Sequence, residues 1–344
     1  MMPLMKTPAF CRTFAAALPL LALAPLAAQK NKDQIVKPIA GPRAASLRIA
    51  RLYVAADINS QSIERVQIGR EMVIAERSGK WVRVFANTDV QELQDNRDEP
   101  LINNSETPAP VSGWMQDRGI VAENTPNGDQ IMMGEAANQE SLASDPRGPA
   151  NAARSARYLY RRVVEMFPSS PLAPEAAWRA ADIRWQLEKA DASSRPSAKE
   201  QAAYMRDTMD ESEMKRLLKD YPHTRQADMA AFALLDNKMC GDWQGQPKCP
   251  EKESEFYEKY AAEHPDGPRT AQALYLAIYR QGALTDMFKA DNQDHKADSA
   301  KARAHDLLNR LKEKFVQSDF TARASAIVFK LDQGISVYGT DRAE

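Results

Sequence analysis

The sequence is poor in the residues and motifs from which most catalytic and metal sites are built. Its 344 residues include only three cysteines and four histidines. No two histidines stand at metal-ligand spacing. The sequence also has no glycine-rich phosphate loop, no G-x-S-x-G elbow and no H-E-x-x-H motif. We therefore expect a protein that is not an enzyme, with no catalytic residues, no metal site and no cofactor.

An excess of charge of one sign is also lacking. The chain has 46 basic and 47 acidic residues, for a formal net charge of −1. Proteins that bind nucleic acid through its phosphates usually carry a basic patch or a basic excess. The composition therefore predicts no nucleic-acid partner.

Long apolar runs are absent beyond the N-terminus. Lys6 and Arg12 precede an apolar stretch at residues 14–26, and small and then polar residues follow it. A helix that spans a membrane needs about 20 apolar residues, so the stretch is too short for that role. It is typical of a secretory signal peptide. We expect cleavage near Ala28, a periplasmic or secreted protein, and no transmembrane segment in the mature chain.

Export affects how the two cysteines in the second half are interpreted. Cys240 and Cys249 enclose a loop that contains Gly241, Gly245 and Pro247, which is flexible enough to bring them together. In an oxidising compartment this favours a local disulfide. A zinc site would need further cysteines or paired histidines nearby. The spacing is too wide for a C-x-x-C redox pair.

One turn signature occurs four times in the second half. The turns begin at Phe167, Tyr221, His264 and Phe315. Apolar residues stand four and seven positions before each turn, and alanine or threonine stands six positions after it. Alanine always stands nine positions after it, at Ala176, Ala230, Ala273 and Ala324. The first three turns continue with proline, whereas the fourth has Val316, which makes it a weaker match.

The signature predicts a repeated helical hairpin. Apolar residues at this spacing form a stripe on one helix, and a proline ends that helix. Small residues early in the next helix allow the two helices to approach closely. A single hairpin cannot bury its stripe, so stacked copies share a core and expose a long face.

These units resemble tetratricopeptide repeats, especially the divergent type of periplasmic helper proteins such as the TolA-binding protein and outer-membrane assembly lipoproteins. The resemblance covers residues 151–336. The turns are more widely spaced than the usual repeat of about 34 residues. The resemblance to these helper proteins implies a scaffold that binds an envelope protein or peptide. Trp178 and Trp185 lie on one helix face, and we expect them either in the core or, if exposed, as contacts for that partner.

Residues 46–122 have the short alternating runs of β-strands. In order they contain Ile68-Gly69, then Gly79-Lys80-Trp81, then Gly113-Trp114. This order resembles the bacterial SH3 domain, a small, partly open β-barrel. An insertion at residues 87–111, either a lid or a plain loop, replaces the usual tight hairpin.

The SH3 resemblance implies an alternative function. Bacterial SH3 domains bind cell-wall peptides or act as spacers, so the partner could instead be peptidoglycan. A core role is favoured for Trp81, while Trp114 fits a core or a ligand-stacking role equally well.

The sequence therefore predicts a multi-domain protein with a small all-β barrel followed by an all-α solenoid. The expected segments are a signal peptide (1–28), a flexible tether (29–45), the β-domain (46–122), a linker with a short helix (123–150), the helical repeats (151–336) and a frayed tail (337–344). A capping-box pattern at residues 197–200 predicts one additional helix. The expected function is that of an exported scaffold or adaptor.

Overall fold

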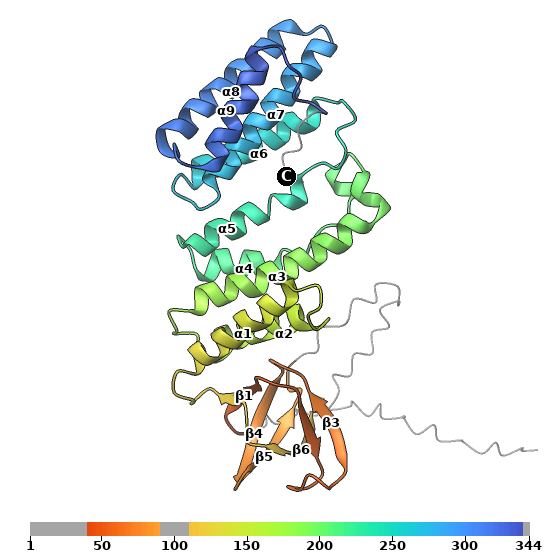
Figure 1. Ribbon diagram of the computed structural model, residues 1–344, viewed down its shortest axis with the longest axis vertical. Helices are drawn as coiled ribbons and strands as arrows, with labels where there is room; N and C mark the ends of the chain where they lie inside the picture. The colour runs from red at the N-terminus through yellow and green to blue at the C-terminus, as the bar shows by residue number, and fades with distance from the viewer. Residues whose placement is uncertain (1–39, 90–109, 340–344) are drawn as a thin grey trace, which may run out of the picture. The chain divides into compact units, whose positions relative to one another are not determined.

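A computed structural model describes residues 40–89 and 110–339 (Figure 1). The predicted signal peptide, residues 29–39 of the tether, most of the insertion and the end of the tail lie outside these residues. The end of the expected tether is not a flexible segment, because residues 43–45 belong to the first strand of the sheet. A β-domain is followed by an α-helical domain, which confirms the predicted order of the two classes. Within the described ranges, no helix is long and apolar enough to cross a membrane.

In the described part of the β-domain, seven strands form one antiparallel sheet in the order β3-β2-β6-β5-β4-β1-β7. The strands are β1 (Arg43–Ser46), β2 (Ala50–Tyr53), β3 (Ser62–Val66), β4 (Glu71–Ser78), β5 (Trp81–Ala86), β6 (Val111–Gln116) and β7 (Ile120–Ala122). β3 and β7 are the two edges, so the sheet is open. Along β5, buried and half-buried residues alternate, as the period of two predicts.

The helices follow one another in chain order, from yellow to blue in Figure 1. They are α1 (Gly128–Ser144), α2 (Ala152–Met166), α3 (Ala173–Ser194), α4 (Ser212–Asp220), α5 (Arg225–Ala233), α6 (Lys248–Glu263), α7 (Thr270–Ala290), α8 (Asp294–Lys314) and α9 (Asp319–Asp332). Each predicted turn joins two helices that pack together, in the pairs α2–α3, α4–α5, α6–α7 and α8–α9.

The helix expected within the linker is present as α1, which packs on α2 and buries Met132 and Ala136. One segment between helices differs from expectation. The helix predicted near Ser197 is absent, and the short 3-10 helices η1 (Pro196–Lys199) and η2 (Ala203–Met205) take its place. The Ser197 hydroxyl donates to Asp207 at 3.0 Å instead of capping a helix, which explains the wrong prediction.

The four turns have one backbone geometry. Their first residues have φ between −129° and −124° and ψ between 38° and 62°. In each, the backbone N–H donates to the carbonyl four residues earlier at 2.8–3.0 Å. The fourth turn follows this pattern with the exposed Val316 in place of proline, so proline is not required for the geometry.

The small residues after each turn are buried between the paired helices. The alanines nine positions after each turn have no exposed surface, and those six positions after are also buried: Ala173, Ala227, Thr270 and Thr321. The hydroxyl of Thr321 donates to the carbonyl of Phe315, and that of Thr270 to the carbonyl of His264. The threonines therefore fill a small space and satisfy a carbonyl at the helix end.

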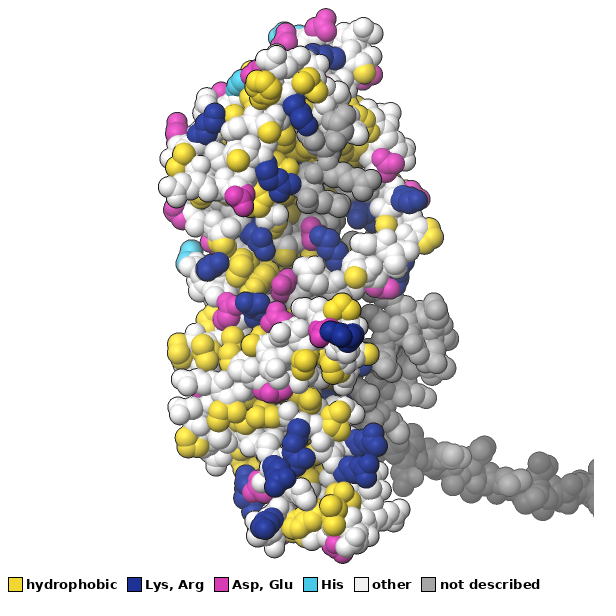
Figure 2. All heavy atoms as spheres, in the orientation of Figure 1, with side chains coloured by type: hydrophobic (Ala, Val, Ile, Leu, Met, Phe, Trp, Pro, Cys, Tyr) yellow, Lys and Arg dark blue, Asp and Glu magenta, His cyan; other side chains and the backbone are white. Residues whose placement is uncertain are grey.

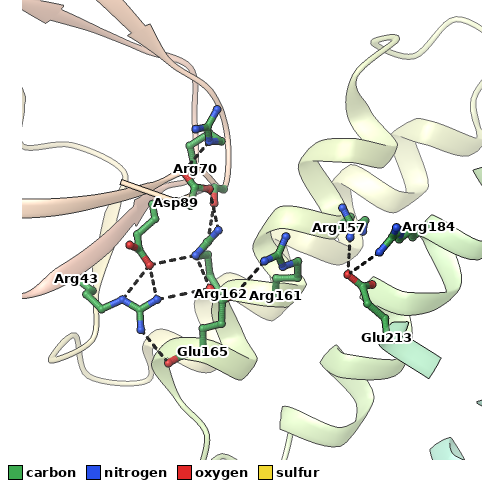
Figure 3. A network of polar contacts seen from close by, with 11 residues as sticks. Arg43, Arg70, Asp89, Arg157, Arg161, Arg162, Glu165, Arg184 and Glu213 are labelled. Atoms are coloured by element: carbon green, nitrogen blue, oxygen red, sulfur yellow. Dashed lines mark hydrogen bonds and ion pairs between the residues drawn. The ribbon is translucent and has the colours of Figure 1, made fainter. Parts of the chain in front are cut away.

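A buried ion network joins helix α2 to the sheet (Figure 3). The side chain of Arg162, only 2% exposed, donates to the Gly69 carbonyl at 3.1 Å and pairs with Asp89 at 2.8 Å and Glu71 at 3.2 Å. Glu165 on the same helix also pairs with Arg162. A Cβ at Gly69, whose φ is +75°, would lie 2.6 Å from the Cβ of Tyr158. The glycine therefore permits both the turn and the close approach of α2.

A second network joins α2 to the next hairpin. Arg157 and Arg184 converge on the carboxylate of Glu213 at 2.6 and 3.7 Å (Figure 3). Arg157 lies on α2, Arg184 on α3 and Glu213 on α4. Because removing one member of a buried ion pair leaves the other charge uncompensated, these pairs hold the three helices in one arrangement.

We expect Ala324→Leu to lower the free energy of unfolding by about 1–3 kcal/mol, because the larger side chain has no space between α8 and α9. Ala326→Leu, at an exposed position of the same helix, should change it by less than about 0.5 kcal/mol. Urea unfolding of both variants measures the two values. Equal values for the two variants would show that Ala324 is not a close-packing position.

Glu71 should make stability depend on pH. Burial alone would raise its pKa, but hydrogen bonds from Arg43 and Thr88 and the charges of Arg162 and Arg43 lower it below the usual value. Such a carboxylate stabilises the fold above its unfolded pKa of about 4.3, and this contribution is lost as the pH falls through the lower folded value. Glu71→Gln should therefore cost about 3 kcal/mol at pH 7, and the difference from the wild type should shrink below about pH 4.

Urea unfolding at pH 7, pH 5 and pH 3.5 measures this difference. Glu76→Gln on the same strand is the matched control, because its side chain is 51% exposed and its pair with Arg83 spans 3.6 Å. It should change stability by less than about 1 kcal/mol at every pH. If Glu71→Gln lowered the free energy of unfolding by the same amount at all three pH values, the lowered pKa assigned to Glu71 would be contradicted.

Candidate protein-binding groove between helices α3 and α7

A cavity of about 400 Å³ lies between the first three hairpins. Helices α3, α5, α6 and α7 line it, together with the 3-10 helix η3 (Asp236–Lys238). We call it the α3–α7 groove. Its apolar lining comes from Trp178, Trp185, Met229, Phe232, Ala233, Tyr257 and Leu276, and its polar lining from Asp182, Gln186, Lys189, Asp236, Arg269, Gln272 and Arg280.

The structure brings the predicted contacts Trp178 and Trp185 together in this groove. Both belong to the apolar cluster that α3 shares with α4 and α5, and their exposed fractions are 7% and 1%. The indole N–H of Trp185 donates to Asp236 at 3.1 Å, and Lys189 donates to the same oxygen at 3.0 Å. Both tryptophans are therefore largely buried side chains that also line the groove.

Arg280 is held in a fixed position at the α7 side of the groove. Its guanidinium lies over the rings of Tyr257, Trp243 and Tyr279, at 4.9, 5.4 and 5.7 Å from their centres. Its Nε donates to Glu253 at 3.0 Å, and the Glu253 side chain is only 2% exposed. Stacking and ion pairing together leave the Arg280 side chain little freedom.

The predicted disulfide between Cys240 and Cys249 is confirmed, and its loop supports Arg280. Trp243 lies in this loop, and its indole N–H donates to Glu253 at 3.2 Å. The backbone N–H of Cys240 donates to the same oxygen at 2.9 Å. Glu253 therefore connects the disulfide loop to Arg280, and through it to the groove.

The start of the expected frayed tail is packed on the same loop. The ring of Tyr338 stacks on Trp243 with centres 6.2 Å apart, and Val337 is fully buried. Asp286 accepts hydrogen bonds from the backbone N–H groups of Val337 and Tyr338 at 2.6 and 2.9 Å. Only residues 340–344 of that tail lie outside the described residues.

Trp114 does not line the α3–α7 groove. It lies half-buried on β6, where Tyr53 and Arg83 are its cross-strand neighbours. Trp81 is also half-buried rather than in the core, and its ring meets Tyr53 edge-to-face at 5.8 Å. These side chains form a small aromatic surface on the face of the sheet opposite its core.

Sequence reasoning missed the charged residues of the groove. Asp182 stands between the two tryptophans at helical spacing, and Arg280 interrupts the apolar residues of α7. A charge placed within an apolar stripe is the signal that could have marked both residues. On the face drawn in Figure 2, side chains of both charges are interspersed with apolar ones.

No group of histidine, cysteine and carboxylate side chains in residues 40–89 and 110–339 could hold a metal ion. Neither a protein-family model nor a curated protein matches the sequence. The case for a function rests on the groove itself.

Replacing both Cys240 and Cys249 with serine should lower the free energy of unfolding by about 2.5–3 kcal/mol, through the entropy of the closed loop. We also expect a weaker near-UV dichroism signal from Trp243, because its loop is no longer closed. Dithiothreitol should have the same effect on the wild type and none on the variant. A wild type whose stability does not respond to the reductant would contradict this structural role.

Proposed function

We propose that this protein is an exported, non-enzymatic scaffold that holds an extended segment of an envelope protein in the α3–α7 groove. The observation that carries the proposal is a cavity of about 400 Å³ lined by aromatic and charged side chains between repeated helical hairpins. Stacked hairpins commonly bind partners on such faces. Binding to a groove whose side chains are already fixed loses less conformational entropy.

The proposal includes the fold families. We assign the hairpins to divergent tetratricopeptide-like repeats, supported by the common geometry of the turns at Phe167, Tyr221, His264 and Phe315. The segments 195–211 and 234–247 lie between hairpins and account for the first two wide spacings. The third comes from the length of α7 and α8, which have 21 residues each. We assign the sheet to the bacterial SH3-like fold, supported by Gly69 before β4 and by Gly79 in the turn before Trp81.

Export rests on two observations. The N-terminal sequence has the charged start, apolar stretch and small residues of a signal peptide. The disulfide between Cys240 and Cys249 suits an oxidising compartment such as the periplasm. An envelope protein or peptide is therefore the partner class that fits the location.

A second candidate function has an observation of its own. The half-buried aromatic side chains of Tyr53, Trp81 and Trp114 lie on one face of the sheet, where Arg83 is the cross-strand neighbour of Trp114. Aromatic rings of this kind can stack on a ligand. In this alternative the β-domain binds peptidoglycan and the helices present it.

The groove is tested with residues 29–344 panned against a random dodecapeptide library. Peptides selected by the wild type should bind Gln272→Trp at least tenfold more weakly, because the indole occupies groove space next to Leu276. Tenfold corresponds to about 1.4 kcal/mol. Gln130→Trp, at an exposed position of α1 outside the groove, is the matched control and should bind as the wild type does.

The outcomes separate the two candidates. Equal affinity of the peptides for the wild type and Gln272→Trp would reject the groove. Retention of the chain on purified peptidoglycan that Trp114→Ala abolishes and Gln272→Trp leaves intact would favour the β-domain. Near-UV dichroism checks that each variant remains folded.

A further inference from the structure

One carboxylate in the α3–α7 groove lacks a cationic partner. Trp178, Asp182 and Trp185 stand four and three positions apart on α3, so they share one helix face, and all three line the cavity. The Gln186 amide donates to Asp182 at 3.1 Å. Among the described residues, no lysine, arginine or histidine nitrogen lies within 4.0 Å of the Asp182 carboxylate.

Three other charged side chains of the groove, Arg280, Lys189 and Asp236, lie in ion pairs. Arg280 pairs with Glu253 at 3.0 Å, and Lys189 pairs with Asp236 at 3.0 Å. Arg269 is exposed, and its guanidinium donates to Gln272 at 3.0 Å. Two charges of the groove therefore have no ion-pair partner among the described residues, the guanidinium of Arg269 and the carboxylate of Asp182. Only the carboxylate is half-buried, so it is the one that has lost part of its contact with water.

Leaving that carboxylate unpaired is unfavourable. Burial raises the pKa of Asp182 above its usual value, against the opposing effects of the Gln186 hydrogen bond and of the more distant Arg269 and Arg179, while Glu140 adds to the rise. A cation placed beside the carboxylate would restore the interaction that burial has removed. A neutral or acidic group in the same place would not.

We propose that the groove receives a lysine or arginine side chain of the bound partner, which pairs with Asp182 while its apolar stem packs against Trp178 and Trp185. The inference rests on the proposed function, because it names the chemistry that the scaffold recognises. Indole faces attract cations in addition to burying methylene groups. The partner is thus a peptide segment with at least one basic residue.

The test uses the indole N–H signals of residues 29–344 in ¹⁵N-resolved NMR spectra. The probe is N-acetyl-arginine amide, and N-acetyl-citrulline amide is its neutral counterpart of the same shape. We expect the arginine probe to shift the Trp178 and Trp185 signals in a saturable way. The citrulline probe should bind at least tenfold more weakly, because it lacks the charge that faces Asp182.

Asp182→Asn keeps the size of the side chain and should weaken binding of the arginine probe at least tenfold. Asp298→Asn, at an exposed position of α8, is the matched control and should leave the affinity for the arginine probe unchanged. The inference is overturned if the arginine probe shifts neither indole signal, or if it binds Asp182→Asn as tightly as the wild type. The dispersed indole signals report that each variant is folded.

Peptide selection separates this inference from the proposed function. Selected peptides that need the open groove but tolerate replacement of every lysine and arginine would overturn the inference and leave the scaffold function standing. If the arginine probe binds through Asp182 while no peptide requires the groove, the cation site stands and the scaffold function fails.

Discussion

Every hairpin of the helical domain depends on one steric condition, the close contact of two helices where only a small side chain fits. Ala176, Ala230, Ala273 and Ala324 meet that condition, and each is fully buried. The turn before them has the same backbone geometry in all four hairpins, with or without proline. Because the paired helices lie so close, their apolar stripes form a common surface that neighbouring hairpins can cover.

The groove arises from what lies between the hairpins. Residues 195–211 separate α3 from α4, and the disulfide loop separates α5 from α6, so the hairpins do not follow one another at a uniform spacing. The space left between α3 and α7 is lined by side chains that insertions help to fix. Glu253 shows this best, since it accepts hydrogen bonds from the disulfide loop and also pairs with Arg280. The helical hairpins thus form the walls of the groove, and the segments between them fix the side chains that line it.

The sequence predicted what depends on local pattern. The helix pairs, their small contact residues and the disulfide follow from periodicity, turn chemistry and a short loop. Buried charges could not be paired in this way, because Arg162 and Glu71 are 91 residues apart and Arg280 and Glu253 are 27 apart. Ser197 shows a local pattern failing, since Asp207, ten residues later, binds the hydroxyl that would have capped a helix. The sequence pattern predicts which face of a helix is buried. Only the tertiary structure shows which side chain pairs with a charged residue on that face.

The distribution of charge in the groove bears on specificity more than on affinity. Pairs such as Arg280–Glu253 are already satisfied within the chain, so a partner gains little from them and would lose hydrogen bonds by displacing them. Asp182 differs, because among the described residues no cationic nitrogen lies within 4.0 Å of its carboxylate, and Arg269 and Arg179 act on it only from farther away. An acidic segment would meet a half-buried charge of its own sign, which costs free energy, whereas a basic one would be stabilised. In the scaffold we propose, one carboxylate without an ion-pair partner, next to Trp178 and Trp185 on α3, would therefore select among partners that fit the groove equally well.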